Sequence, residues 1–228
     1  MDGQKKIFCK QNIPNMLLVL RMLLVPVIIG LLIAEHYQVG NNPEIYHLID
    51  PFHKGGHYSS IHLYFLLAAI FFVLAAITDW LDGFIARKYN WVSDFGKLWD
   101  PIADKVLVNS VLICFAWMTI IPVFIPVIMI ARDVCVDAQK MVAAKKGTVV
   151  AANYWGKLKT ILQMVGIVLI FFFFDCHYYE VQIEPAYKGL YWGVQNLMLY
   201  LATVMSVASG IIYFIDINKA LKNNGKQN

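Results

Sequence analysis

Four aspartates stand in two pairs near the middle of this 228-residue chain. Asp79 and Asp82 are three residues apart, and Asp100 and Asp104 are four apart. On a helix, either spacing places both carboxylates of a pair on one face, about one turn apart. A short polar connection separates the pairs, which predicts two antiparallel helices whose carboxylates converge.

Four converging carboxylates need positive charge to balance them, above all at a membrane boundary. One buried aspartate costs roughly 2.5–3.5 kcal/mol on insertion scales. Arg87 lies nearby but neutralises only part of this charge. Oxygen ligands without histidine or cysteine favour hard ions, Mg²⁺ or Mn²⁺, over zinc. Two such ions sharing four carboxylates are typical of phosphoryl-transfer sites.

Small residues next to the aspartates leave room for a bulky ligand. Gly83 and Ala86 lie on or beside the carboxylate face of the first helix, and Gly96 precedes Asp100 by one turn. Arg87 can reach a phosphate with a bidentate fork. Acidic residues at helix ends are commonly only solvated and have no other role. That explanation would require the aspartates, the small residues and Arg87 to have these spacings by chance.

The elements that carry this segment are predicted to be membrane helices. The chain is 59% hydrophobic and 15% charged, with a mean hydropathy of +0.59. Soluble domains carry roughly 25% charged residues, so a soluble, disordered or disulfide-rich secreted protein is excluded. Six apolar stretches lie near the ~20 residues that a membrane-spanning helix needs. They run approximately over Pro14–Ala34, Ile61–Leu81, Val106–Ile121, Pro122–Val142, Ile161–Phe174 and Leu190–Ile215.

The third and fifth stretches are short, and we expect their helices to begin earlier, inside polar sequence. The predicted fold is all-α, with six transmembrane helices in a single membrane-embedded catalytic domain over residues 1–228. Within it, residues 1–12 and 218–228 are predicted to be cytoplasmic segments. Of the 19 lysines and arginines, all but Lys54 and Lys188 fall on the side of the N-terminus. The positive-inside rule makes that side cytoplasmic and places both termini and the aspartates there.

The segment resembles the signature of the CDP-alcohol phosphatidyltransferase family at all eight fixed positions: Asp79-x2-Asp82-Gly83-x2-Ala86-Arg87-x8-Gly96-x3-Asp100-x3-Asp104. The resemblance implies a six-helix enzyme of the bacterial plasma membrane, usually a homodimer. Such enzymes displace CMP from a CDP-linked lipid with a hydroxyl nucleophile and use two divalent cations.

The resemblance also implies a role for each aspartate. Asp79 and Asp100 would contact both metals, while Asp82 would bind one metal and Asp104 the other. Asp104 would also be the catalytic proton acceptor. A metal-bound carboxylate has a lowered pKa and is a weak base, so we expect Asp104 to act mainly by orienting the attacking hydroxyl.

The family pattern further implies a CDP-diacylglycerol site. Gly83, Arg87 and Ser93 would line it, with Asn15 as a neighbour. Cytidine would stay in water while the acyl chains remain in lipid.

Other stretches resemble the members of the family whose acceptor is glycerol 3-phosphate: residues 12–15, 131–133 and 156–160, together with Arg21. Two features depart from their pattern. Asp133 stands where glutamate is more usual, and the outer loop at residues 35–60 is longer.

Glycerol 3-phosphate is a dianion, so its site needs cations besides the metals. Arg132, Lys157 and Lys159 are predicted at cytoplasmic helix ends, and Arg21 lies inside the first helix, where it could join them. Each lysine is equally well explained as a positive-inside anchor. Arginines within apolar runs are costly, which favours a functional role for Arg132 and Arg21.

Three alternatives stay open at this point. The acceptor could be another alcohol, such as phosphatidylglycerol in a cardiolipin synthase or an inositol phosphate. A divalent-cation transporter would also place carboxylates in a membrane, although no internal repeat is visible. An assembly protein with a degenerate site is disfavoured by the intact signature.

Overall fold

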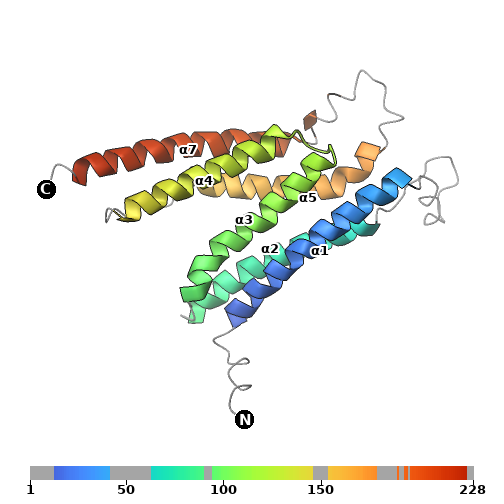
Figure 1. The fold of residues 1–228 in the computed structure, drawn as a ribbon, viewed down its shortest axis with the longest axis horizontal. Coiled ribbons are helices and arrows are strands. Elements are labelled where there is room, and N and C mark those ends of the chain that lie inside the picture. Colours follow the sequence, from blue (N-terminus) through green and yellow to red (C-terminus); the bar gives the residue numbers. More distant parts are fainter. Residues whose placement is uncertain are drawn as a thin grey trace, which may run out of the picture. The chain divides into compact units, whose positions relative to one another are not determined.

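The computed structural model describes residues 13–41, 63–89, 94–145, 154–178, 189, 193–194 and 196–224, which form helices and turns without a strand among them. Along these residues the long helices follow one another as Figure 1 shows. They are α1 (Ile13–Asn41), α2 (Leu63–Tyr89), α3 (Asp94–Trp117), α4 (Phe124–Lys145), α5 (Tyr154–Tyr178) and α7 (Leu197–Asn224). The predicted all-α fold is therefore confirmed.

Two helices begin well before their apolar stretches, as predicted. α3 begins at Asp94, twelve residues ahead of the stretch that starts at Val106, and α5 begins at Tyr154, seven ahead of Ile161. The first turns of these helices consequently carry polar and charged side chains. α7 begins at Leu197, later than the predicted start of the last stretch.

Three described segments are long and apolar enough to cross a membrane: Met16–Tyr37, Tyr154–Phe172 and Leu197–Ile217. The apolar part of α2, Leu63–Asp79, is shorter. Large apolar side chains cover the outer faces of these helices, with Leu23, Phe172 and Val204 more than half exposed. Such faces suit contact with hydrocarbon rather than water, and the chain is an integral membrane protein.

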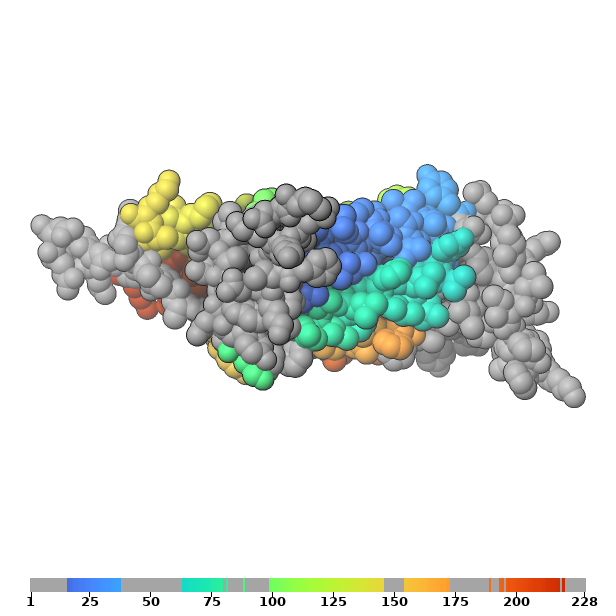
Figure 2. Space-filling model, turned by 90° about the horizontal axis from the view of Figure 1, so that it is seen from below, coloured from blue at the N-terminus to red at the C-terminus, as the bar shows by residue number. Residues whose placement is uncertain are grey.

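The chain divides into two compact units, Met1–Cys114 and Phe115–Asn228. In the first unit α1 packs along α2, and Figure 2 shows the two helices side by side. Their buried residues alternate at spacings of three and four, the pattern of interlocking helices. These residues are Leu18, Arg21, Val25, Ile28 and Leu32 on α1 and Phe65, Ala68, Phe72 and Ala75 on α2.

In the second unit α7 packs against both α4 and α5. Small residues on α7, Ala202, Ser206 and Ser209, are buried and let the neighbouring backbones approach. Gly166 on α5 has the same function, since a Cβ built there would lie 2.7 Å from Leu199 Cδ2 and 3.4 Å from Leu199 N.

A tight turn connects α3 to α4. Thr119 adopts a φ of 61°, and its N–H donates to Ala116 O at 3.1 Å while Ile120 N–H donates to Phe115 O at 2.9 Å. This pair of bonds is the Schellman arrangement that ends helices. Asn196 Nδ2 donates to Ile120 O at 3.3 Å, so the segment before α7 holds the turn that leads into α4.

Replacing Gly166 with alanine tests the close contact between α5 and α7. We expect Gly166→Ala to lower the free energy of unfolding by about 1–3 kcal/mol, because the added methyl group overlaps a fully buried leucine. The measurement is the Tm in detergent. Gly30→Ala is the matched control, since a Cβ there meets nothing within 4 Å. Equal Tm values for the two variants would contradict the packing.

Candidate functional site

A buried arginine contacts the first aspartate of the sequence motif. Arg21 is fully buried on α1, and its Nη1 lies 2.5 Å from Asp79 Oδ1 on α2. Asp79 follows Ala75 by four residues and so extends the row of buried positions on α2 toward the side chain of Arg21. The contact therefore follows from the register of the α1–α2 interface. About 40% of the Asp79 side chain remains exposed and can accept another ligand.

The second aspartate pair contributes Asp100 to the same region. Burial raises the pKa of Asp100; the Arg21 guanidinium lowers this pKa in part, and the Asp79 carboxylate raises it further. Asp79 and Asp100 come from different pairs, so α2 and α3 bring their carboxylates within electrostatic range, as predicted. Burial is therefore the main cause of the raised pKa, and the effect of Arg21 on this pKa outweighs that of Asp79.

The remaining residues of the motif are only partly described. Asp104 lies one turn after Asp100 on α3 and is partly buried. Asp82, Gly83 and Arg87 lie on α2 and Asn15 on α1, but their side chains fall outside the described residues. Ser93 lies outside them altogether. Their roles stay predictions.

The described carboxylates fit hard divalent ions in their chemistry, because they offer only oxygen atoms as ligands. Within the described part of the chain, no group of three or more histidine, cysteine, aspartate or glutamate side chains could hold a metal ion. The side chain of Asp82, one of the four predicted ligands, lies outside the described residues, so this statement does not include it.

A second charged cluster, made of Arg132, Asp133 and Lys159, lies in the other unit. Lys159 Nζ donates to both oxygens of Asp133, at 2.9 Å to Oδ1 and 2.8 Å to Oδ2. Arg132 Nη1 donates to the same Oδ1 at 3.0 Å. Lys159 and Asp133 are 4% and 7% exposed, so both charges are buried. Within this trio, one carboxylate bonds to two cations, so the three side chains carry a formal charge of +1.

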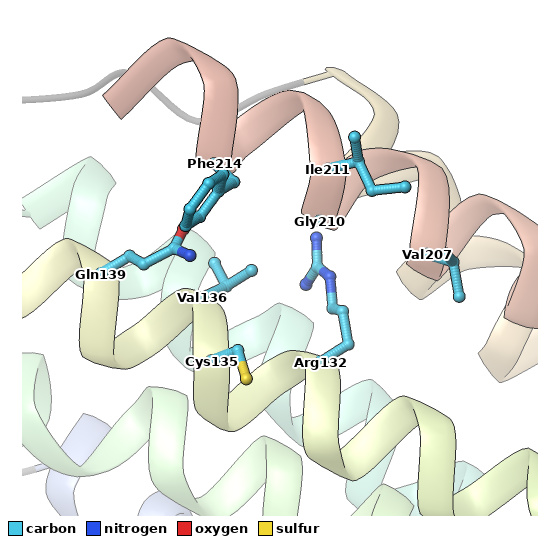
Figure 3. A pocket seen from close by; sticks show the side chains of 8 residues that line it. All are labelled: Arg132, Cys135, Val136, Gln139, Val207, Gly210, Ile211 and Phe214. Atoms are coloured by element: carbon cyan, nitrogen blue, oxygen red, sulfur yellow. The ribbon is translucent and has the colours of Figure 1, made fainter. Parts of the chain in front are cut away.

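Two further bonds attach Arg132 to α7. Nε donates to Ser206 O at 3.1 Å, and Nη2 donates to Ser209 Oγ at 2.6 Å. Figure 3 shows the guanidinium reaching from α4 toward Gly210, in a pocket of about 310 Å³ between α4 and α7. With the Asp133 bond, these contacts use three of the five N–H groups of the side chain. The other two N–H groups have no hydrogen-bond partner among the described residues.

The predicted acceptor residues thus have different partners within their own units. Arg132 and Lys159 share one carboxylate, and Lys157 is exposed on α5. Arg21 contacts Asp79.

Sequence reasoning missed the groups that hold Arg132. Asp133 was noted as a departure from a pattern and not as a partner of the two cations. The available signal for α7 was two serines at helical spacing before a glycine in an otherwise apolar helix.

The helices define an integral membrane protein, and the two charged clusters are its candidate binding sites. An acidic cluster suits metal ions, and a buried cluster of net positive charge suits a phosphate group. The CDP-alcohol phosphatidyltransferase family profile matches residues 11–208. The chain belongs to this family.

Relatives resemble the chain over most of its length. A CDP-diacylglycerol–glycerol-3-phosphate 3-phosphatidyltransferase of Mycoplasma genitalium is 40% identical over 93% of this chain and 86% of its own length. The protein of the same name in Mycoplasma pneumoniae is 38% identical over 72% of each chain. The one in Bacillus subtilis is 31% identical over 93% of this chain and 98% of its own length.

A double-mutant cycle tests the pair between Arg21 and Asp79. We expect Asp79→Ala to lower the free energy of unfolding by about 1–3 kcal/mol, because it takes a carboxylate away from a buried guanidinium. Adding Arg21→Met should recover most of this loss, since no charge is then left buried. Tm in detergent is the measurement. Strictly additive effects of the two substitutions would show that the contact contributes nothing.

Proposed function

We propose that the chain is a phosphatidylglycerophosphate synthase. It would transfer the phosphatidyl group of CDP-diacylglycerol to sn-glycerol 3-phosphate and release CMP, in phospholipid biosynthesis. The observation that carries the proposal is the 40% identity to the Mycoplasma genitalium enzyme across 93% of the chain. The net positive cluster around Arg132 supports it, because the acceptor carries a phosphate dianion.

The acidic cluster is proposed to hold two divalent cations, Mg²⁺ or Mn²⁺. Asp79, Asp82, Asp100 and Asp104 would be their ligands, with the electrostatic coupling of Asp79 to Asp100 in support. Bound ions would neutralise the pyrophosphate as its bond to CMP breaks. Asp104 would orient the hydroxyl of the acceptor and take its proton late, as the new bond to phosphorus forms.

The donor lipid is proposed to lie beside the acidic cluster. Gly83 would leave room for it, Arg87 would bind its pyrophosphate, and Ser93 and Asn15 would complete the site. The motif on which these roles rest runs along α2 and into α3, next to the aspartates.

The acceptor phosphate is proposed to bind the basic side chains Arg132, Lys157 and Lys159, with Arg21 as a further cation. Arg132 is the main proposed phosphate ligand, because two of its N–H groups have no partner among the described residues and could bind a phosphate. Lys159 would act together with Asp133, to which it is bound.

The enzyme is proposed to act at the cytoplasmic face of a bacterial plasma membrane, as a homodimer with both termini in the cytoplasm. The asymmetry of lysine and arginine supports this orientation.

The decisive test is an assay of purified protein with CDP-diacylglycerol and several acceptors. We expect CMP release with glycerol 3-phosphate and Mg²⁺, and its loss with EDTA and recovery with excess Mg²⁺. Phosphatidylglycerol and inositol phosphate are the comparison acceptors. Preference for either of them would replace the proposed acceptor, and metal-dependent uptake into vesicles without CMP release would favour a transporter.

Substitutions in the acidic cluster test its catalytic role separately from folding. We expect Asp100→Asn to reduce kcat by at least about 100-fold, because the side chain keeps its size but loses the charge that would bind a cation. Asp216→Asn on α7 is the control, since Asp216 is exposed and outside the motif. Full activity of Asp100→Asn would refute the metal assignment.

A further inference from the structure

The C-terminal helix α7 holds the side chain of Arg132, although it contains none of the predicted site residues. Arg132 Nε donates to Ser206 O at 3.1 Å, and Nη2 donates to Ser209 Oγ at 2.6 Å. Ser206 and Ser209 are both fully buried. The match to the family profile ends at residue 208, just before Ser209.

The Ser209 hydroxyl is oriented to accept. Its single proton goes to Ser206 O at 3.0 Å, and so the lone pairs of Oγ are directed to Arg132 Nη2. A hydroxyl fixed in this way selects one orientation of the guanidinium. A bond to a charged donor is also stronger than one between neutral groups.

Gly210 provides the space that the arginine side chain needs. A Cβ built at this position would lie 3.1 Å from Arg132 Cγ, 3.6 Å from Nε and 3.9 Å from Cδ. Figure 3 shows Arg132 directed at this part of α7. The side chain thus lies close against the α7 backbone, and a Cβ at position 210 would require it to shift by a few tenths of an ångström.

Together these contacts fix a long, flexible side chain. An arginine side chain has many rotamers, and an unsupported one would lose this conformational freedom on binding a phosphate. Arg132 is held by Asp133 on its own helix and by Ser206 and Ser209 on α7, and its orientation is therefore set before a ligand arrives.

We propose that Ser209 and Gly210 are positioning residues that act through Arg132 and set the affinity for the acceptor phosphate. The identity of the acceptor, glycerol 3-phosphate, is taken from the proposed function. The competing explanation is that these residues only pack α4 against α7. Packing alone would change stability, and the two substrates would be affected alike.

Kinetics of CMP release distinguish the two explanations. We expect Ser209→Ala to raise KM for glycerol 3-phosphate roughly tenfold, because Arg132 loses one charge-assisted bond. KM for CDP-diacylglycerol should stay within about twofold. Thr203→Val is the matched control: Thr203 is a buried α7 residue whose hydroxyl donates to Leu199 O at 2.7 Å, in its own helix.

The same substitution in an Arg132→Ala background tests whether Ser209 acts through the arginine. We expect Ser209→Ala to have no further effect on kcat/KM for glycerol 3-phosphate in that background. Gly210→Ala should raise the same KM, whereas Gly30→Ala should not. An unchanged KM in Ser209→Ala, equal increases for both substrates, or a full additive effect without Arg132 would overturn the proposal.

A binding measurement keeps this result separate from the proposed function. Inorganic phosphate should raise the Tm of the unaltered protein, less so that of Ser209→Ala, and that of Arg132→Ala least. If the unaltered protein releases no CMP with glycerol 3-phosphate, the proposed function fails while this series still tests the positioning. Equal Tm shifts in all three proteins would reject it.

Discussion

The fold depends on one constraint, which is that a charge inside an apolar helical protein needs an opposite charge at a fixed distance. Arg21 forms an ion pair with Asp79. Arg132 and Lys159 both bind the carboxylate of Asp133. Removing one partner from such a group leaves a buried charge, which costs far more than a surface ion pair contributes. Each group therefore fixes how its helices pack.

Helix packing in turn decides where these charges lie. On α1 and α2 the spacing of buried residues aligns Arg21 with Asp79. On α7 the small residues let α5 approach and give Arg132 a place to lie. Small residues thus determine how near a charged side chain can come to a neighbouring helix.

Both clusters combine carboxylates with cations. The pKa of Asp100 is raised mainly by burial, and the nearby Arg21 guanidinium lowers it in part. Around Asp133 two cations share one carboxylate, which leaves surplus positive charge. Carboxylates suit cations, whereas arginine and lysine side chains suit anions, so the two clusters favour ligands of opposite charge.

The sequence by itself determined the helices, because hydropathy and length are local properties, and it identified the aspartates, because a one-turn spacing puts their carboxylates on one face. It also picked out Arg132 and Arg21, since arginines inside apolar runs are costly.

Only the tertiary structure decided the partners of these side chains. Arg132 meets Ser209, 77 residues away, and Arg21 meets Asp79. Such contacts depend on the register between helices, and an apolar sequence hardly encodes this register because many registers bury equally apolar surfaces.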